Sequence, residues 1–386
     1  ATAVSVVCRV GSDIVMTADA IVEAPRTAYV FPGQGTQHQG MGLETRTRSA
    51  AARAVWDRAD AHTRAALGFS VLAVIRDNPT DIVARGVTHR HPKGVLFLTQ
   101  FTQVAMATLA LAQVAELREA GVFVESAVSC GHSVGEYNAL AAATGILPLE
   151  SLVEIVFHRG MAMHRLVPRD AFGRSNYGLA AIRPNECGLT DRSVVDFVAD
   201  TVSRSGEFIE IVNYNLAGAQ YAVAGTVAGL AALEAAIVAR QERTGGKRAF
   251  ILIPGIDVPF HSSVLRDGVA GFRSTLEELL PARIDHTLLV DRYVPNLVPR
   301  LFSLDRDFVA EIADLVPSQP LRELLGEWST RSQDPDAVAR VLLVELLAWQ
   351  FASPVRWIET QDLLFGELGV DTLVEVGVAN APTLAN

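Results

Sequence analysis

The stretch that decides the fold is residues 128–137, Val-Ser-Cys-Gly-His-Ser-Val-Gly-Glu-Tyr. An apolar run leads into it from residue 122, and an alanine-rich segment follows it as far as Gly145. This order predicts a strand, a tight turn and a helix. Gly-His-Ser-Val-Gly between a strand and a helix is typical of a nucleophile elbow, which exposes the hydroxyl of Ser133 at the end of a sheet. The alternative is an ordinary turn in which Ser133 only caps the helix.

The composition describes a chain with enough apolar residues for a large core. Hydrophobic residues make up 49% of the 386 positions, which suits one large α/β domain with an insertion, or two domains. No apolar run is long enough to span a bilayer, so a soluble protein without membrane contact is expected. The net charge of −10 argues against a nucleic-acid partner. The three widely spaced cysteines suggest neither disulfides nor a metal site, so a reducing cytoplasm is expected.

The order of predicted elements indicates an α/β fold: an α/β-hydrolase-like doubly wound parallel sheet with an inserted ferredoxin-like small subdomain. Residues 1–25 predict a β-hairpin, the tail of a preceding region or a linker. Residues 26–175 predict the first part of the large subdomain. Residues 176–254 have the β-α-β-β-α-β order of a ferredoxin-like subdomain. Residues 255–386 complete the large subdomain, with a helical insertion at about 281–340.

A serine hydroxyl needs a base, and the chain contains nine histidines. His261 follows a predicted strand, and loops at the carboxyl ends of parallel strands converge on one crevice. His132 adjoins Ser133, but its side chain is expected to leave the turn on the opposite side. From position alone, a surface histidine explains His261 equally well.

Arg159 lies on a predicted helix between apolar or small neighbours, and a buried arginine needs an anion. A structural carboxylate is the commoner partner, and a substrate carboxylate is the alternative. The backbone N–H groups of Gln34 and Val134 could form an oxyanion hole. The side-chain oxygen of Gln350 could orient a histidine, since no acidic residue stands out for that role.

These pieces, in this order, resemble the malonyl-CoA:acyl carrier protein transacylase family. The resemblance covers nearly the whole chain from Tyr29 onward. The matching stretches are FPGQGTQ (31–37), FTQVAMATLA (101–110), GHSVGEYNALAAATG (131–145), HRGMAM (158–163), NYNLAGAQYAVAG (213–225), VPFHSSVL (258–265), QFASPVRW (350–357) and LVEVG (373–377).

The resemblance implies a role for each candidate residue. Ser133 would be the nucleophile, His261 its general base, and Arg159 the partner of the malonate carboxylate. The oxyanion hole would be formed by the backbone N–H groups of Gln34 and Val134. Four supporting residues are also implied: the main-chain carbonyl of Gln350 to hold the histidine ring, Phe260 to crowd an α-methyl branch, Asn215 to line the cleft, and Gln103 within the matching helix.

The hairpin at residues 1–25, together with an extra stretch between His261 and Gln350, resembles the malonyl/palmitoyl transferase region of microbial type I fatty acid synthases, the fungal and mycobacterial kind. Residues 1–25 would then be the tail of a hot-dog-fold dehydratase region in a longer polypeptide. The resemblance implies ping-pong transfer of malonyl from CoA to an acyl carrier domain, and of palmitoyl or another long acyl chain from the carrier to CoA.

The partners implied by this resemblance are malonyl-CoA, long-chain acyl-CoA, the phosphopantetheine of the carrier domain and the other domains of the same synthase. No covalently bound cofactor and no metal are expected. Three alternatives stay open: a serine esterase or thioesterase, a polyketide-synthase acyltransferase, and a non-catalytic docking segment of a multienzyme.

Overall fold

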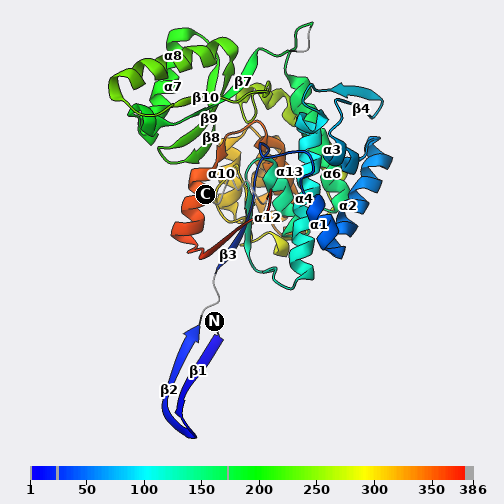
Figure 1. The fold of residues 1–386 in the computed structure, drawn as a ribbon, viewed down its shortest axis with the longest axis vertical. Helices are drawn as coiled ribbons and strands as arrows, with labels where there is room; N and C mark the ends of the chain where they lie inside the picture. Colours follow the sequence, from blue (N-terminus) through cyan, green and yellow to red (C-terminus); the bar gives the residue numbers. More distant parts are fainter. Residues whose placement is uncertain (1, 23–25, 172–173, 379–386) are drawn as a thin grey trace.

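The computed structural model describes residues 2–22, 26–171 and 174–378. Residues 1 and 23–25 of the predicted 1–25 segment lie outside the described residues, as do residues 379–386. Figure 1 shows a larger α/β body, a smaller lobe above it, and a two-stranded ribbon that projects from the body.

The large body is built on a four-stranded sheet whose order is β11-β6-β3-β13. The strands are β11 (Tyr293–Val294), β6 (Val128–Gly131), β3 (Thr27–Phe31) and β13 (Thr372–Glu375). Every pair of neighbours is parallel, and β3 and β6 are buried along their whole length because helices cover both faces. Phe31 pairs with Gly131, so the turns that carry Gln34 and Ser133 leave the sheet at the same edge.

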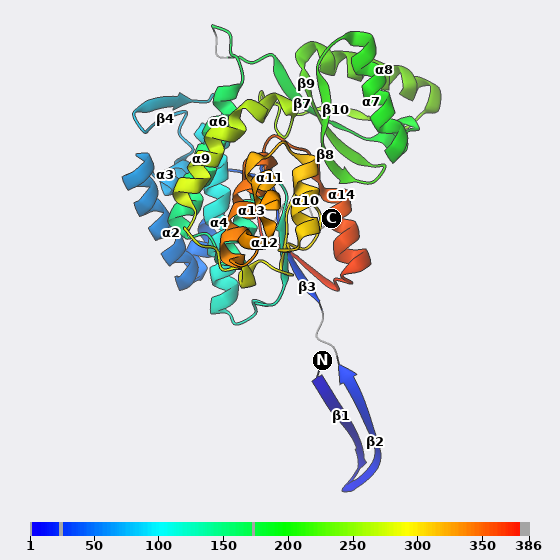
Figure 2. The same cartoon turned by 180° about the vertical axis from the view of Figure 1, so that it is seen from behind.

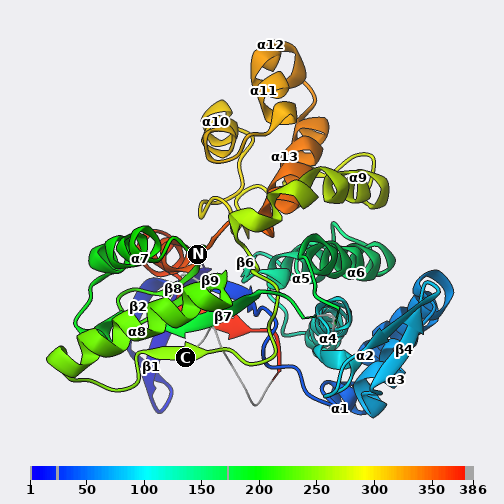
Figure 3. The same cartoon turned by 90° about the horizontal axis from the view of Figure 1, so that it is seen from above.

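Helices enclose this sheet, and the longest of those described is α4 (Thr99–Glu119), which is buried over most of its length. It packs against α2 (Ala50–His62), α5 (Val134–Ala142) and α6 (Leu149–Leu166). In Figure 3 most helices of the later chain lie apart from α2 and α4, although α9 (Val269–Leu279) packs against α6. The other helices of the later chain are α10 (Arg306–Leu315), α11 (Gln319–Gly326), α12 (Trp328–Arg331) and α13 (Pro335–Gln350), with α14 (Trp357–Gln361) beyond them.

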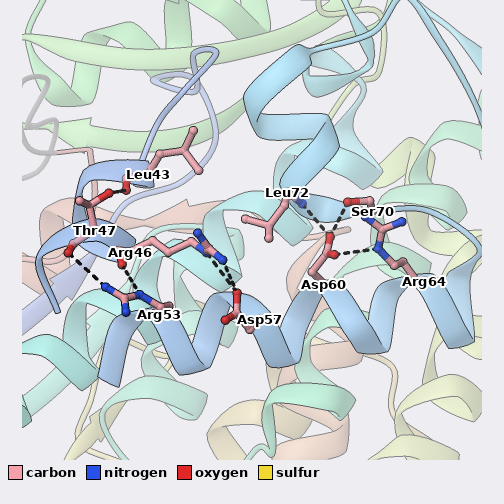
Figure 4. A network of polar contacts seen from close by, with 9 residues as sticks. All are labelled: Leu43, Arg46, Thr47, Arg53, Asp57, Asp60, Arg64, Ser70 and Leu72. Atoms are coloured by element: carbon pink, nitrogen blue, oxygen red, sulfur yellow. Dashed lines mark hydrogen bonds and ion pairs between the residues drawn. The ribbon is translucent and has the colours of Figure 1, made fainter. Parts of the chain in front are cut away.

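Short helices before α4 frame one side of the body, and Figure 4 shows how they are tied together. They are α1 (Leu43–Arg48) and α3 (Val71–Asp77), on either side of α2. Asp60 accepts hydrogen bonds from the Leu72 N–H (3.1 Å), the Arg64 Nε (2.7 Å) and the Ser70 hydroxyl. Partial burial opposes ionisation, but these donors hold the pKa of Asp60 below its usual value. A single carboxylate thus joins α2 to the start of α3.

The smaller lobe is an antiparallel sheet of order β10-β7-β9-β8 with two helices on one face (Figure 1). Its elements in chain order are β7 (Tyr177–Ile182), α7 (Asp191–Ser205), β8 (Ile209–Leu216), β9 (Gln220–Thr226), α8 (Val227–Thr244) and β10 (Phe250–Leu252). This is the β-α-β-β-α-β order predicted from the sequence. A capping box between Thr190 and Ser193 starts α7, and Gly206, in the left-handed conformation, follows its end.

Three features differ from the sequence-based expectation. The lobe has a fifth strand, β12 (Val355–Arg356), which pairs in parallel with β8 although it is distant in sequence. The predicted helical insertion at about 281–340 contains β11, a buried strand of the main sheet, whose two residues are too few for a periodic signal. The predicted strand from residue 122 begins only at Val128, because Phe123 stacks on Tyr29 beside the sheet at 4.5 Å.

Two hairpins complete the structure. The sequence did not predict β4 (Asp81–Ala84) and β5 (Val87–Arg90), which Arg85 and Gly86 join with φ angles of 48° and 75°. The predicted N-terminal hairpin is confirmed as β1 (Thr2–Val10) and β2 (Asp13–Val22), an antiparallel pair. Figure 2 shows this ribbon extending away from the body. Within the described residues, no helix is long and apolar enough to cross a bilayer.

Candidate active site

The turn between β6 and α5 has the geometry of a nucleophile elbow. Ser133 adopts φ 56° and ψ −120°, a conformation that L-residues rarely occupy. A Cβ at Gly131 would lie 2.1 Å from the carbonyl carbon of Gly135, and one at Gly135 would lie 1.9 Å from the carbonyl oxygen of Phe31. Both positions therefore require glycine, because β3, β6 and α5 meet there at backbone distance.

Asn296, in the loop after β11, fastens this strained turn. Its Oδ1 accepts a hydrogen bond from the Ser133 N–H at 2.8 Å, and its Nδ2 donates to the carbonyl of Gly131. Asn296 is buried, and the sequence analysis did not single it out. The only local signal is a polar residue within an apolar run, Val-Pro-Asn-Leu-Val, which does not indicate its partner.

Ser133 and His261, 128 residues apart, meet at this edge of the sheet. The Oγ of Ser133 lies 2.7 Å from Nε2 of His261. The Nδ1 of the same ring lies 3.0 Å from the carbonyl oxygen of Gln350 and 3.2 Å from that of Ser353. Because carbonyls only accept, Nδ1 carries the proton and Nε2 is free to accept the serine proton. His261 has φ 63°, and its N–H donates to the carbonyl of Phe351 at 3.0 Å.

The environment of His261 keeps the imidazole neutral. The ring is 3% exposed, and burial followed by the nearby charge of Arg159 lowers its pKa to about 3. The neutral form is the one that can act as a base. Two carbonyls take the place that an acidic residue holds in a Ser-His-Asp triad.

This pKa predicts the pH dependence of serine acylation. For a thioester whose acyl group carries no charge, kcat/KM is expected to stay flat as the pH falls from 8 to about 5. The imidazole of His261, with its lowered pKa, remains unprotonated over this range. A histidine with an ordinary pKa would lose activity near pH 6.5. The measurement is the pH profile of pre-steady-state acylation. An acid limb near pH 6.5 would contradict the deduced environment of His261.

Arg159 projects from α6 toward the serine and is 1% exposed. Its Nη1 donates to Gln103 Oε1 at 3.0 Å, and its Nη2 donates to Gln350 Oε1 at 2.6 Å and to Ser133 Oγ at 3.4 Å. Within the described residues it forms no ion pair, so the structural carboxylate that the sequence analysis favoured is not found. Its buried Nε has no hydrogen-bond partner there. The guanidinium therefore keeps capacity for an anion beside the nucleophile.

The side chain of Gln350 does not orient His261, so that hypothesis is wrong and its main-chain carbonyl has the role instead. Its Nε2 donates to the carbonyl of Ser133 (2.6 Å) and to Glu136 Oε2 (2.7 Å), while its Oε1 accepts from Arg159. A glutamine amide can accept on one end and donate on the other. It thereby connects the positive guanidinium to a buried carboxylate without direct contact between them.

Glu136, in the first turn of α5, is the second residue that the sequence analysis missed. It is fully buried and accepts hydrogen bonds from the Tyr293 hydroxyl, the Asn296 N–H (3.3 Å) and Gln350. Burial raises its pKa to about 7, although these donors oppose the rise. Its sequence position, three residues after Ser133 in an apolar helix, is the only signal of a buried carboxylate.

We expect Glu136→Gln to disturb the arginine rather than the nucleophile alone. A glutamine at this position turns an N–H₂ group toward a donor that Glu136 now accepts from. When that donor is the Gln350 amide, Gln350 must rotate, and Arg159 then loses the Gln350 Oε1 as its acceptor. The expected results are a fall of about tenfold or more in kcat/KM for acylation by a thioester whose acyl group carries a carboxylate, and a loss of about 1–3 kcal/mol in the free energy of unfolding. Exposed Glu367→Gln is the matched control. Unchanged kinetics with that thioester would refute this positioning role.

Two N–H groups lie near the elbow as predicted for an oxyanion hole. Val134 is the first residue of α5, and Gln34 lies in the turn after β3, which is paired with β6. Among the turn and loop hydrogen bonds of the described residues, neither N–H donates to a backbone carbonyl. The side chain of Gln34 is held elsewhere, since its Oε1 accepts from Thr99 Oγ1 at 2.8 Å. The oxyanion hole formed by these two N–H groups stays a prediction.

A cavity of about 370 Å³ opens between the body and the small lobe, and Ser133 lies in its wall. The body contributes Gln103, Arg159 and Phe260, and the small lobe contributes Asn215. The expectation for His132 is wrong: its ring lines the same cavity, and its Nε2 lies 2.9 Å from Asn215 Oδ1. The pairing of β12 with β8 brings the small lobe close enough for this contact.

One group in the described residues has the donor types of a metal site, namely Asp285, His286 and Asp336. It lies away from the elbow, in the predicted insertion. Asp336 already pairs with His286 (2.8 Å) and lies 3.5 Å from Arg283. The described residues that line the cavity with Ser133 include no such group.

A serine paired with a neutral histidine at the end of a parallel sheet defines a nucleophilic acyl-transfer enzyme of the α/β class. The chain matches the acyl transferase domain family over residues 28–244, and it belongs to that family. The predicted fold class and family resemblance are therefore confirmed.

Curated relatives are long fungal proteins. The chain is 36% identical to fatty acid synthase 2 of Mycosarcoma maydis, over 96% of this chain and 12% of that protein. It is 31% identical to fatty acid synthase subunit beta of Saccharomyces cerevisiae, over 83% of this chain and 20% of that protein. The chain thus spans only a small part of these relatives.

Solved structures support the same fold. An acyl-carrier-protein S-malonyltransferase from Burkholderia pseudomallei 1710b is 27% identical, with a TM-score of 0.66 over 92% of this chain and 90% of that one. A malonyl CoA-acyl carrier protein transacylase from Coxiella burnetii is 21% identical, with a TM-score of 0.67 over 94% of this chain and 90% of that one. The second likeness concerns the fold alone.

Proposed function

We propose that this chain transfers a malonyl group from CoA to the phosphopantetheine thiol of an acyl carrier domain in fatty acid synthesis, through an ester on Ser133. The observation that carries the proposal is a buried arginine without a carboxylate partner, 3.4 Å from the nucleophile that His261 activates. A nucleophilic serine alone suits any acyl group. A free guanidinium beside it suits an acyl group with a carboxylate of its own.

The first half-reaction begins at the thioester carbonyl. Ser133 Oγ forms a bond to the carbonyl carbon while Nε2 of His261 takes the hydroxyl proton. The negative charge moves to the carbonyl oxygen, where the N–H groups of Gln34 and Val134 stabilise it. Collapse of this tetrahedral intermediate breaks the carbon–sulfur bond, and the protonated His261 returns its proton to the CoA thiolate. The products are malonyl-Ser133 and free CoA.

The second half-reaction is the reverse with another thiol. The phosphopantetheine sulfur of the carrier attacks the ester, His261 takes the thiol proton, and Ser133 leaves as an alcohol that regains the proton. Arg159 holds the malonate carboxylate throughout, in place of its longer contact with Ser133 Oγ. Phe260 beside the cavity restricts substitution at the α carbon. CoA and the carrier act here as substrates, and no bound cofactor takes part in a step.

A second substrate class is favoured by the walls of the same cavity. Apolar side chains from both lobes line it, namely Leu179, Leu216, Ile253, Ile256 and Phe260. We propose that a palmitoyl or other long acyl chain lies against them during transfer from the carrier to CoA. Such a chain gives Arg159 no anion, so the guanidinium must then keep its bonds to Gln103 and Gln350.

The cellular setting follows from the relatives and is part of the proposal. We propose that the chain works as one region of a larger cytoplasmic fatty acid synthase, with its carrier and other catalytic domains as partners. In that setting the N-terminal hairpin belongs to a preceding dehydratase-like region. The experiment below distinguishes this function from that of an esterase and from a non-catalytic role. A polyketide-synthase acyltransferase stays an alternative.

The decisive experiment follows the acyl group. The protein is incubated with malonyl-CoA, the modified peptide is identified by mass spectrometry, and pantetheine is then added. Malonyl on the peptide that contains Ser133, discharged to pantetheine faster than to water, is the expected result. Steady hydrolysis that outruns transfer would indicate an esterase. Absence of any ester on Ser133 would support a non-catalytic role.

A further inference from the structure

A second cavity, of about 280 Å³, lies between the β4–β5 hairpin and α6, outside the acyl-transfer site. Its α6 wall consists of Phe157, His158, Met161 and Arg165. Successive helix residues are separated by about 100°, so these side chains point away from the face that carries Arg159. The two cavities therefore lie on opposite faces of one helix. The proposed acyl transfer makes no use of the second one.

Every polar side chain that lines this cavity is an arginine or a histidine. The hairpin contributes Arg85 and His89, and α6 contributes His158 and Arg165. The remaining lining side chains are apolar: Ala84, Val87, Phe157 and Met161. No carboxylate among the described residues lines it. Arg85 and Arg165 are exposed, but two guanidinium groups that line one cavity attract an anion more strongly than one of them would alone.

The arginines of this cavity have no carboxylate partner in the described part of the chain. Among the described residues, the side chain of Arg85 makes one hydrogen bond, from Nη1 to Nε2 of His158 at 3.1 Å. The side chain of Arg165 makes none there. The nearest acidic influence on His158 comes from Glu154 and Glu278, which do not line the cavity. Glu154 is paired with His62 at 2.7 Å. Two positive charges, both on exposed side chains, thus have no carboxylate partner among the described residues around this cavity.

The histidines act here as neutral donors. Burial and then the charge of Arg85 lower the pKa of His158, while burial and then the charge of Arg165 lower that of His89. His158 accepts from Arg85 on Nε2, which leaves the proton on Nδ1. His89 Nδ1 lies 3.2 Å from Gln100 Nε2, so its proton is on Nε2. The site therefore offers two guanidinium forks and imidazole N–H groups, with a charge of two.

We propose that this cavity binds a phosphate dianion, either free or as a phosphomonoester, held by Arg85 and Arg165 with the two histidines as additional donors. Two guanidinium groups match the charge of a dianion, and their planar forks match the geometry of phosphate oxygens. The apolar walls leave room for the organic part of a monoester beside the phosphate.

The test is calorimetric titration of the intact protein with inorganic phosphate in a chloride buffer of low ionic strength. We expect saturable binding of one phosphate per chain. Arg85→Gln and Arg165→Gln should each weaken it by about tenfold or more, because each removes charge-assisted hydrogen bonds. Arg85→Lys should retain part of the affinity. No saturable binding by the parent protein, or binding by both glutamine variants as tight as that of the parent, would overturn the proposal.

The control is Arg192→Gln, which removes an exposed arginine from α7 in the small lobe. It should bind phosphate as the parent does, and unfolding curves should show that all variants are folded. A parallel titration with adenosine 3′,5′-bisphosphate separates the two forms of ligand. Tighter binding than phosphate, lost in Arg85→Gln, indicates a phosphomonoester; equal or weaker binding indicates free phosphate.

Discussion

Ser133→Ala is expected to abolish malonyl loading and to reduce transfer to pantetheine by at least about 10⁴-fold. The alanine removes the hydroxyl oxygen that lies 2.7 Å from Nε2 of the neutral His261, so no ester can form at this position. What remains is binding of two substrates without a covalent link between the half-reactions. The measurement is incorporation of radiolabel from malonyl-CoA, followed by discharge to pantetheine.

The effect should be specific to this hydroxyl. Ser274→Ala is a suitable control, because Ser274 is exposed on α9 and its hydroxyl bonds only the carbonyl of Ala270. Alanine at position 133 retains the turn, since the fastening bond from Asn296 is to the backbone N–H. If Ser133→Ala incorporates label as the parent does, the nucleophile has been assigned wrongly.

Arg159→Ala has the second largest expected effect, and it should divide the two proposed substrates. Malonyl transfer should fall by about 10²- to 10³-fold, the loss of two charge-assisted hydrogen bonds to the carboxylate. Palmitoyl transfer should change little or rise, because an apolar chain no longer lies beside a buried charge. The measurement is kcat/KM for malonyl-CoA and palmitoyl-CoA with the same preparation.

Palmitoyl transfer in the same variant shows whether the site is still folded. Arg159→Lys provides the second comparison, since it keeps the charge and loses the fork; its malonyl activity should lie between the two. The pH profile gives an independent readout. Removal of the Arg159 charge should raise the pKa of His261 and move the acid limb upward. Equal losses for both acyl groups would contradict the carboxylate role.

Much of the fold could be predicted because its signals are local. The helix predicted around Arg159 is confirmed as α6, since its period and the preceding Pro148 are contained in the segment itself. The small lobe has its predicted order because turns and caps such as Gly206 separate its elements. The elbow is only partly local: Gly131 is crowded by the backbone of Gly135 in the same turn, whereas Gly135 is crowded by the backbone of Phe31 in β3.

The site was only partly predictable, because its contacts are long-range. Sequence position could suggest that Gln350 serves His261, but not that the carbonyl does so while the side chain spans Arg159 and Glu136. The expectation that the His132 side chain leaves the turn on the opposite side was wrong, since its ring lines the same cavity and meets Asn215 of the small lobe. Asn296 comes from a loop beyond a two-residue strand that no periodic pattern reveals.

The sequence by itself thus determined that Ser133 occupies a strained turn and that a histidine and an arginine are available to it. Only the tertiary structure decided that His261 is neutral and that Arg159 has no carboxylate partner among the described residues. Both depend on burial, and burial depends on which distant segments pack around a residue. The position of the nucleophile is encoded locally in the sequence. The packing of β6, α6 and α13 determines the protonation state of His261 and the partners of Arg159.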